Sequence, residues 1–242
     1  MTFNHVKGFI AIGAVFLIVI YFVSCASKSE SETAHAMNVS DGIILQDLPG
    51  SIDKQAGYLF YLHGQIIEEL GIRPEHPQWG IYEYEQILDS LKHEKTVVIS
   101  EARTKDTDVE EYAQKIMKQV EILLAAAVPA GQITVVGASK GAIIAMRVST
   151  LLKNKQVNFV TIAACNDWVL ENYDFNLHGN ILSIYEESDT RNGSCKAEYF
   201  RRSEGINRFK EIGLKTGLGH GLLYKPLRAW IGPTLEWMAW TR

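Results

Sequence analysis

The chain has 242 residues, of which 47% are hydrophobic, 10% aromatic and 21% charged, the composition of an ordinary globular domain. This length suits one domain with a full hydrophobic core. The formal net charge is −4 at pH 7, and no stripe of Lys and Arg with interleaved aromatic residues is present. These features argue against a nucleic-acid partner.

Residues 1–24 are expected to be a signal peptide of the lipoprotein type. Residues 1–7 carry one positive charge, residues 8–23 are uncharged and almost wholly apolar, and Ser24-Cys25-Ala26 follows. A basic start, an apolar run and small residues at its end are typical of a secretory signal. Residues 22–25 resemble a bacterial lipoprotein box, in which Cys25 carries the lipid and becomes the new N-terminus.

An uncleaved signal anchor stays open as the alternative, because the apolar run of 16 residues comes close to spanning a bilayer. Either way the domain is exported to the bacterial cell envelope and tethered to a membrane. Residues 25–41 are polar, rich in Ser and Glu and without periodicity, which predicts a flexible tether. The folded domain is expected over residues 42–242.

Strands and helices are predicted to alternate along this domain. Residues 42–48 and 57–62 are expected to be strands, and residues 66–80, with two prolines, are expected to be irregular. The first helix is predicted from one apolar face, made by Ile81, Tyr84, Ile87, Leu88 and Leu91.

The alternation continues to the end of the chain, with a second helix that Asp106, Thr107 and Asp108 are expected to cap. Such alternation predicts an α/β fold with right-handed crossovers, a mostly parallel central sheet, helices on both faces and no cap domain. Strands are expected at 95–100, 133–136, 157–164, 180–185 and 207–215, and helices at 109–124, after Gly141, and at 226–240.

The strand at residues 133–136 leads into Gly137-Ala138-Ser139-Lys140-Gly141 and then into an apolar segment with helical spacing. A strand, a G-x-S-x-G turn and a helix form the arrangement called a nucleophile elbow. In so sharp a turn Ser139 takes a strained conformation, and side chains at the glycine positions would collide with the neighbouring strand and helix. The motif predicts an exposed Ser139 hydroxyl at a helix N-terminus, which favours developing negative charge.

A serine nucleophile needs a base and a group that orients the base. The acid candidates Glu186, Glu187 and Asp189 follow the strand at 180–185, and His220 follows the last strand in a Gly-rich segment. All of them fall at carboxyl ends of strands, where ligands gather in parallel sheets. The chain order of serine, acid and histidine is that of the α/β-hydrolases.

The chain resembles the α/β-hydrolase superfamily over nearly all of residues 42–242. The resemblance is carried by His63-Gly64, GASKG at 137–141, ESD at 187–189 and GHG at 219–221. It is similar to a group of small, poorly characterised bacterial α/β-hydrolases with the same YLHG and VVGASKG runs and no settled substrate.

The resemblance implies that Ser139 is the nucleophile, His220 the general base and then the acid, and Asp189 the orienting carboxylate. Asp189 is preferred because the acid in this family sits a few residues beyond the strand end. The oxyanion hole is expected to use the backbone N–H groups of Lys140, which follows the nucleophile, and of Gln65.

Gln65 is chosen because Gly64 before it lets the backbone approach closely. His63 is expected to be a structural hydrogen-bonding residue, and the Lys140 side chain to be solvated or paired. His76, His93 and His178 are weaker candidates for the base because of their places in the chain.

Cys165 and Cys195 each lie just beyond the end of one of two successive strands. In an exported domain they could close a disulfide, although a simple buried Cys165 stays open as well. No cluster has metal-ligand spacing, and no phosphate loop or dinucleotide fingerprint is present, so no cofactor is expected.

We therefore expect a serine hydrolase that cleaves an ester, thioester or amide of a small-molecule acyl substrate through an acyl-enzyme, in the simplest case an esterase. A peptidase or an acyltransferase would use the same residues. A membrane-tethered, hydrolase-like binding domain without turnover is the alternative from another class. Residues 166–179 are the one candidate lid, with Trp168, Tyr173 and Phe175 as apolar walls.

Overall fold

The structure is a computed structural model, and it describes residues 41–196, 199 and 202–239. The expected signal peptide, Cys25 and all of the tether but Asp41 therefore lie outside the described residues. Within the described ranges, no helix combines the length and the apolar character that crossing a membrane requires.

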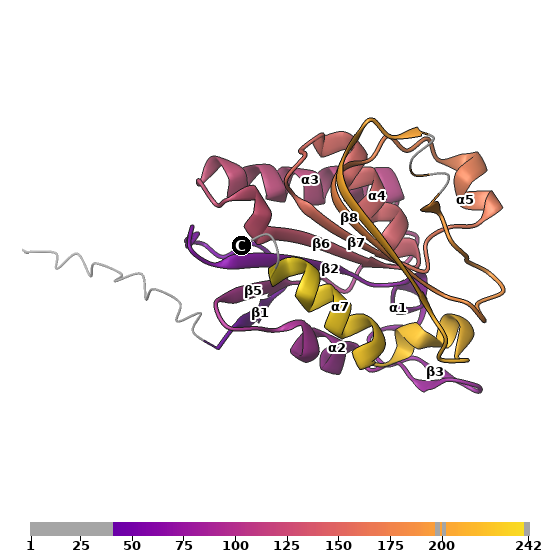
Figure 1. Ribbon diagram of the computed structural model, residues 1–242. Helices are drawn as coiled ribbons and strands as arrows, with labels where there is room; N and C mark the ends of the chain where they lie inside the picture. The colour runs from indigo at the N-terminus through magenta and orange to yellow at the C-terminus, as the bar shows by residue number, and fades with distance from the viewer. Residues whose placement is uncertain (1–40, 197–198, 200–201, 240–242) are drawn as a thin grey trace, which may run out of the picture. The chain divides into compact units, whose positions relative to one another are not determined.

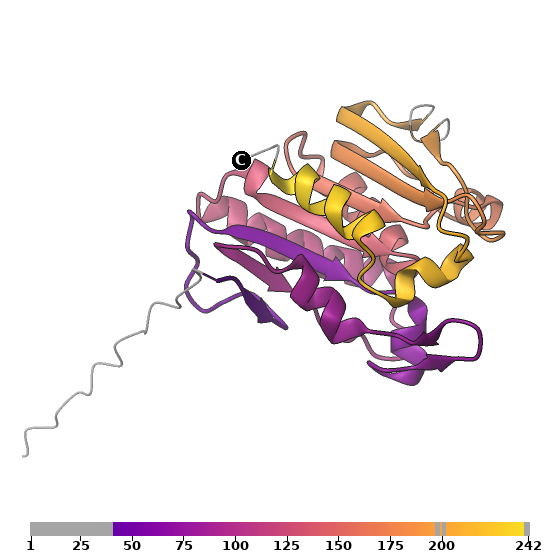
Figure 2. The same ribbon diagram turned by 60° about the horizontal axis from the view of Figure 1, so that its bottom comes forward.

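A parallel sheet forms the centre of the domain, in the strand order β1-β5-β2-β6-β7-β8-β9 (Figures 1 and 2). The predicted parallel α/β fold is confirmed, and β1, which falls within the first expected strand at residues 42–48, lies at one margin of the sheet. The strands are β1 (Ile43–Leu45), β2 (Gly57–Leu62), β5 (Thr96–Ile99), β6 (Ile133–Ala138), β7 (Asn158–Ile162), β8 (His178–Glu186) and β9 (Gly205–Leu214).

Helices cover both faces of this sheet (Figure 1). On one face lie α3 (Val109–Ala125) and α4 (Lys140–Leu152), and on the other lie α2 (Tyr84–Leu91) and α7 (Arg228–Ala239). The two faces carry two separate hydrophobic clusters, which explains why β2, β6 and β7 are buried along their whole length.

Strand β2 shows how one run of residues serves both clusters. Tyr58, Phe60 and Leu62 belong to the cluster under α3 and α4, whereas Leu59 and Tyr61 belong to the cluster under α2 and α7. Successive side chains of a strand point to opposite faces, so an unbroken apolar run is buried twice.

The start of α3 is capped as predicted. The Asp108 carboxylate accepts hydrogen bonds from the backbone N–H groups of Glu110 and Glu111, both at 2.9 Å. The cap satisfies amides that have no partner inside the helix, and it fixes where the chain leaves the loop after β5.

The expectation of an irregular segment at residues 66–80 is wrong. Helix α1 (Gln65–Leu70) follows β2 directly, and a hairpin of β3 (Glu75–His76) and β4 (Gly80–Ile81) comes next. Ile81 lies on β4 and is 44% exposed, so it is not part of the apolar face of α2. A helix of six residues and strands of two are too short to give a periodic signal, and tertiary contacts define them.

The predicted disulfide between Cys165 and Cys195 is confirmed, with the two Cα atoms 5.5 Å apart. It joins the loop after β7 to the segment that follows β8. The Gly193 N–H donates to the Cys165 carbonyl at 2.9 Å, which holds the same two segments together through the backbone.

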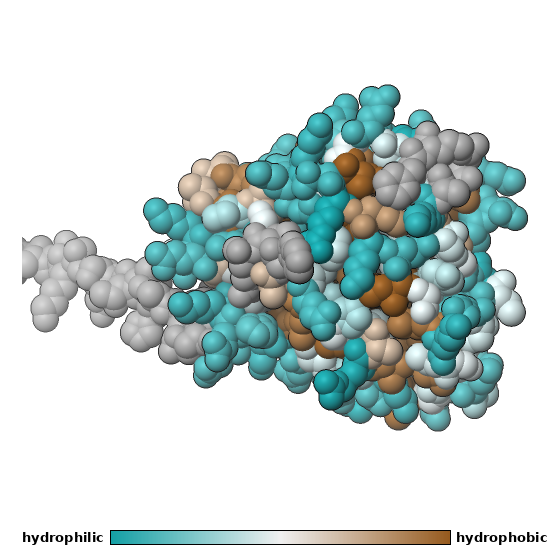
Figure 3. Space-filling view, in the orientation of Figure 1, coloured by the Kyte–Doolittle hydropathy of each residue, from teal (hydrophilic) through white to brown (hydrophobic). Residues whose placement is uncertain are grey.

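Polar residues cover much of the face drawn in Figure 3, and apolar residues are grouped in its lower half, where α7 lies. This face thus mixes polar and apolar residues, as the surfaces of folded domains commonly do.

Candidate active site

Ser139 lies at the sharp turn between β6 and α4, with φ 52° and ψ −120°. A non-glycine residue with positive φ is strained, and such strain is typical of functional sites. A Cβ on Gly137 would overlap the Gly141 carbonyl, and a Cβ on Gly141 would overlap the Leu62 carbonyl of β2. Both glycines are therefore required because strand, turn and helix approach so closely, as the motif predicts.

The turn lies at the switch point of the sheet. After β2 the chain continues to β5, which lies beside β2 on one side, and after β6 it continues to β7, which lies beside β6 on the opposite side. The loops after β2 and β6 therefore diverge and leave a space between them. Gly64 faces Ser139 across it, since a Cβ on Gly64 would lie 3.5 Å from the Ser139 Cβ. This is where a ligand is expected to reach the serine.

The structure brings His220 and Asp189 to Ser139. His220 is part of the 3-10 helix η2 (Gly219–Tyr224), and its Nε2 lies 3.1 Å from the Ser139 Oγ. Its Nδ1 lies 2.8 Å from the Asp189 Oδ2. A carboxylate can only accept, so Nδ1 carries the proton and the Nε2 lone pair faces the serine hydroxyl.

Asp189 is held ionised by its surroundings. Burial raises its pKa, but hydrogen bonds from His220, the Arg191 backbone N–H and Asn192 outweigh the burial and leave the pKa below its ordinary value. Asn192, which the sequence analysis did not single out, donates from Nδ2 to the Asp189 Oδ2 at 3.3 Å and lies equally far from the His220 Nδ1. No local pattern marks this asparagine.

Glu186, one of the three acid candidates, lies elsewhere and holds the loop that leads to His220. Its carboxylate accepts from the Thr216 hydroxyl at 2.7 Å, the Thr216 N–H at 3.0 Å and the Ser188 hydroxyl at 2.9 Å. Ser188 in turn accepts from the Gly219 N–H at 3.0 Å. Burial raises the pKa of Glu186, but these hydrogen bonds prevail and lower it.

The third acid candidate, Glu187, points to the surface. Its nearest ionic partner is Lys215, at 3.6 Å, and both side chains are largely solvated. Of the three carboxylates after β8, only Asp189 contacts the imidazole of His220.

Gln65 and Lys140, the expected oxyanion residues, begin α1 and α4 respectively, and both line the space around Ser139. The first N–H groups of a helix have no partner within the helix, which is why anions bind at such positions. Their role as an oxyanion hole stays a prediction.

His63 is structural in this fold. Its Nε2 accepts from the Arg103 N–H at 2.8 Å, and its Nδ1 donates to the Gly64 carbonyl at 2.8 Å. Burial, aided by the nearby Arg103 charge, lowers the pKa of His63 to about 3. A neutral histidine thus fixes the turn that carries Gly64.

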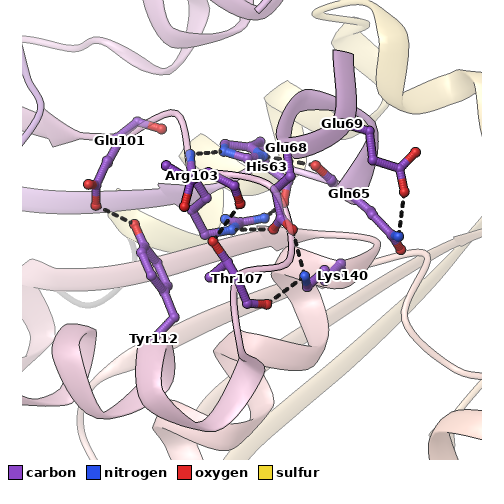
Figure 4. A network of polar contacts seen from close by, with 12 residues as sticks. His63, Gln65, Glu68, Glu69, Glu101, Arg103, Thr107, Tyr112 and Lys140 are labelled. Atoms are coloured by element: carbon purple, nitrogen blue, oxygen red, sulfur yellow. Dashed lines mark hydrogen bonds and ion pairs between the residues drawn. The ribbon is translucent and has the colours of Figure 1, made fainter. Parts of the chain in front are cut away.

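The Lys140 side chain is paired, as expected, and it belongs to a buried network that the sequence did not reveal (Figure 4). Glu68 on α1 binds Lys140 Nζ at 2.6 Å and Arg103 Nε at 2.7 Å. Lys140 also donates to the Thr107 carbonyl at 2.7 Å, and Arg103 donates to the His63 carbonyl. The network ties α1, the loop after β5 and the first residue of α4 together beneath the two expected oxyanion amides.

Two clefts meet at Ser139, and Gln65, Arg191 and His220 line both of them. The polar cleft has a volume of about 520 Å³, and the aromatic cleft one of about 350 Å³. The lining of the polar cleft includes Asp106, Thr107, Asp108, Asn166 and Trp168. The lining of the aromatic cleft includes Ile66, Leu70, His76, Trp79, Tyr82 and Tyr224.

The candidate lid is partly helical, as α5 (Asp167–Asn172). Trp168 and Tyr173 line the polar cleft as expected. Phe175 does not, because it is 4% exposed and belongs to the core cluster under α3 and α4. Its expected role as a cleft wall is therefore wrong.

The sequence matches no protein-family model and no curated protein. Among solved structures, SOBER1 from Arabidopsis thaliana is similar, with a TM-score of 0.50 and 11% identity over 77% of this chain and 99% of that one. A protein of unknown function from Agrobacterium tumefaciens, assigned to the α/β-hydrolases, has a TM-score of 0.50 and 18% identity over 78% of this chain and 87% of that one. At such identities the likeness concerns the fold, and the chain has the α/β-hydrolase fold that its sequence resemblance implies.

Glu186→Gln should destabilise the fold near pH 7 by about 1–3 kcal/mol, because it removes hydrogen bonds to a buried carboxylate. The pKa of Glu186 is lowered in the folded chain, so its stabilisation is present above the ordinary value of 4.5 and is lost as pH falls through the folded pKa. The difference from wild type should therefore shrink in acid. Urea titrations at several pH values measure it, and Glu187→Gln, as matched control, should change stability by less than about 0.5 kcal/mol.

Glu68→Gln should cost about 3–5 kcal/mol of stability, because it leaves the buried Arg103 guanidinium without its carboxylate. The matched control is Glu69→Gln on the same helix, whose exposed carboxylate accepts only from the Gln65 side chain in the described contacts. Thermal melts of both variants test this. Equal melting temperatures for the two would contradict a structural role for the Glu68 network.

Proposed function

We propose that the protein is a serine hydrolase that cleaves an ester, thioester or amide through an acyl-enzyme, and that esterase activity is its simplest form. The observation that carries the proposal is the chain of contacts from Ser139 Oγ through His220 to Asp189, at 3.1 and 2.8 Å. Both distances lie within the hydrogen-bond range that general-base catalysis needs.

In the proposed reaction the Ser139 Oγ attacks the substrate carbonyl carbon while His220 Nε2 takes the hydroxyl proton. The carbonyl oxygen becomes an oxyanion, which the N–H groups of Gln65 and Lys140 stabilise at two helix starts. Asp189 stabilises the imidazolium and keeps its Nδ1 proton in place. The imidazolium then gives its proton to the leaving group, and the acyl-enzyme remains.

Water completes the cycle in the same geometry. His220 Nε2 takes a proton from the water that attacks the acyl carbon, and the proton then returns to Ser139 Oγ as the acid departs. A peptidase differs in its leaving group and an acyltransferase in its acceptor. The open clefts support a small-molecule substrate, and the α/β-hydrolase assignment of the Agrobacterium protein is in keeping with hydrolysis.

We also propose that the domain is exported and held at the bacterial cell envelope by a lipid on Cys25. The apolar run that ends at Ser24-Cys25 motivates this proposal. The disulfide between Cys165 and Cys195 supports it, because disulfides persist in oxidising compartments such as the periplasm and the cell surface.

Ser139→Ala and His220→Ala should each lower kcat by about 10⁶-fold, and the double variant should be little worse, because triad members act as one unit. Asp189→Asn should cost about 10⁴-fold, since it leaves the serine and the base in place. Hydrolysis of p-nitrophenyl esters and labelling by a fluorophosphonate probe measure these effects.

Glu187→Gln is the control for the acid assignment. If it lowers kcat more than Asp189→Asn does, Asp189 is not the orienting acid. Full activity of Ser139→Ala on every ester tested would contradict the hydrolase proposal, and it would favour the tethered binding domain.

Mass spectrometry of the mature protein from membranes should find a diacylglyceryl-modified N-terminus at Cys25. Cys25→Ser should abolish the modification and release the domain from the membrane or leave the signal uncleaved. An unmodified chain that begins at Met1, or cleavage at another bond, would reject lipidation.

A further inference from the structure

The two clefts that meet at Ser139 differ in chemistry. The polar cleft presents two carboxylates, Asp106 and Asp108, near its end by α3. The rings of Trp168 and Tyr173 line the polar cleft as well, but the aromatic cleft has a larger set, from the hairpin of β3 and β4 and from Tyr224 at the end of η2, with Glu69 and Arg191 as its charged lining. A substrate whose carbonyl carbon lies at Ser139 has an acyl side and a leaving-group side, and the two clefts offer a place for each.

The rings of the aromatic cleft form one packed cluster. His76 stacks on Trp79 with ring centroids 4.0 Å apart, and Tyr224 packs edge-on against Trp79 at 5.1 Å. Tyr82 lies 5.1 Å from Tyr224. Such contacts hold the rings in fixed orientations, so the cleft has a preformed wall.

This wall offers ring surfaces more than hydrogen-bonding groups. The Tyr82 hydroxyl is bonded to the Tyr61 hydroxyl at 3.1 Å, within the core. The Trp79 Nε1 is buried and has no hydrogen-bond partner among the described residues, so it is not exposed to the cleft. Leu70, another lining residue, is 64% exposed and adds apolar surface to the cleft.

Trp79 also connects the cleft to the proposed base. Its ring packs so closely on Gly221, the residue after His220, that a Cβ there would lie 2.6 Å from the Trp79 Cγ. The centroids of the Trp79 and His220 rings are 6.5 Å apart. A group that rests on the Trp79 ring is therefore beside the reacting atoms.

We propose that the aromatic cleft binds an aryl or similarly flat apolar group of the substrate, and that Trp79 determines this specificity. The inference rests on the proposed serine hydrolase function, and it narrows the substrate class to esters or amides with such a group next to the scissile bond. The polar cleft receives the other, more polar side of the substrate. The flat group belongs either to the acyl part or to the alcohol part of the ester, and the comparison of esters below distinguishes the two.

The test compares kcat/KM for three esters of similar intrinsic reactivity: ethyl acetate, ethyl phenylacetate and benzyl acetate. The second ester adds a ring on the acyl side and the third adds one on the alcohol side. We expect one of the two to be preferred over ethyl acetate by about 10- to 200-fold, the range that apolar pockets achieve.

Trp79→Ala should reduce this preference to less than about threefold, and Trp79→Phe, which keeps a ring, should retain most of it. The readout is the ratio of kcat/KM between esters. Trp79→Ala could also disturb His220, but such damage lowers kcat/KM for all three esters alike and leaves the ratio unchanged. Trp168→Ala, which removes the exposed ring of the polar cleft, is the matched control and should leave the ratio unchanged.

The possible outcomes separate this inference from the proposed function. If Ser139 reacts with a fluorophosphonate probe but neither ring-bearing ester is preferred, or Trp79→Ala keeps the preference, the aromatic-cleft inference is overturned and the hydrolase proposal stands. If Ser139 does not react and no ester is cleaved, the hydrolase proposal fails.

In that case the cleft is tested by binding alone. Ligand-observed NMR with benzyl acetate on Ser139→Ala should show binding that the added Trp79→Ala change abolishes. Absence of binding, or binding that survives the loss of Trp79, overturns the inference.

Discussion

The close packing of β2 against the turn between β6 and α4 is the constraint on which the rest of the site depends. Gly141 in α4 lies against the carbonyls of Leu62 and His63, at the end of β2, with no room for a Cβ. The helix therefore starts directly beside the loop after β2. Because of this contact, Gly64 faces Ser139, and Gln65 and Lys140 line the same cleft.

Two buried carboxylates other than Asp189 hold the two sides of this arrangement. Glu68 joins the segments on the side of the expected oxyanion amides, and Glu186 joins the end of β8 to the loop before His220. A buried carboxylate is costly unless it is paired with donors. Each oxygen of Glu68 and of Glu186 accepts at least one hydrogen bond, so the two carboxylates define loop positions where a weaker surface contact would not.

The loop that carries Asp189 is fixed on both sides of the acid. Glu186 precedes it with its hydrogen bonds to Thr216, and Cys195 follows it with the disulfide to Cys165. Between them, Asn192 donates to the Asp189 carboxylate. A carboxylate on an untethered loop would lose its orientation through backbone freedom, and these contacts restrict the backbone on both sides of Asp189.

The sequence by itself determined the features that depend on neighbouring residues. The β-branched run before Gly137, the two glycines of the elbow and the Asp108 cap are local signals, since strand burial, turn sterics and capping involve residues a few positions apart. The order of Ser139, acid and His220, together with strand ends at one edge of the sheet, was enough to nominate the candidate site. It left three carboxylates after β8 as candidates for the acid.

Only the tertiary structure shows which of them contacts His220, because Glu186, Glu187 and Asp189 are chemically alike and differ in what lies opposite each one. The same holds for α1 and the β3–β4 hairpin, which are too short for a periodic signal, and for the Glu68 network. Trp79 lies in the β3–β4 hairpin and Tyr224 at the end of η2, far apart in the sequence, and their rings meet only in the folded chain. Such contacts depend on the order of the strands and on the path of the loops. Both are set by the packing of the whole chain, so a short stretch of sequence does not predict them.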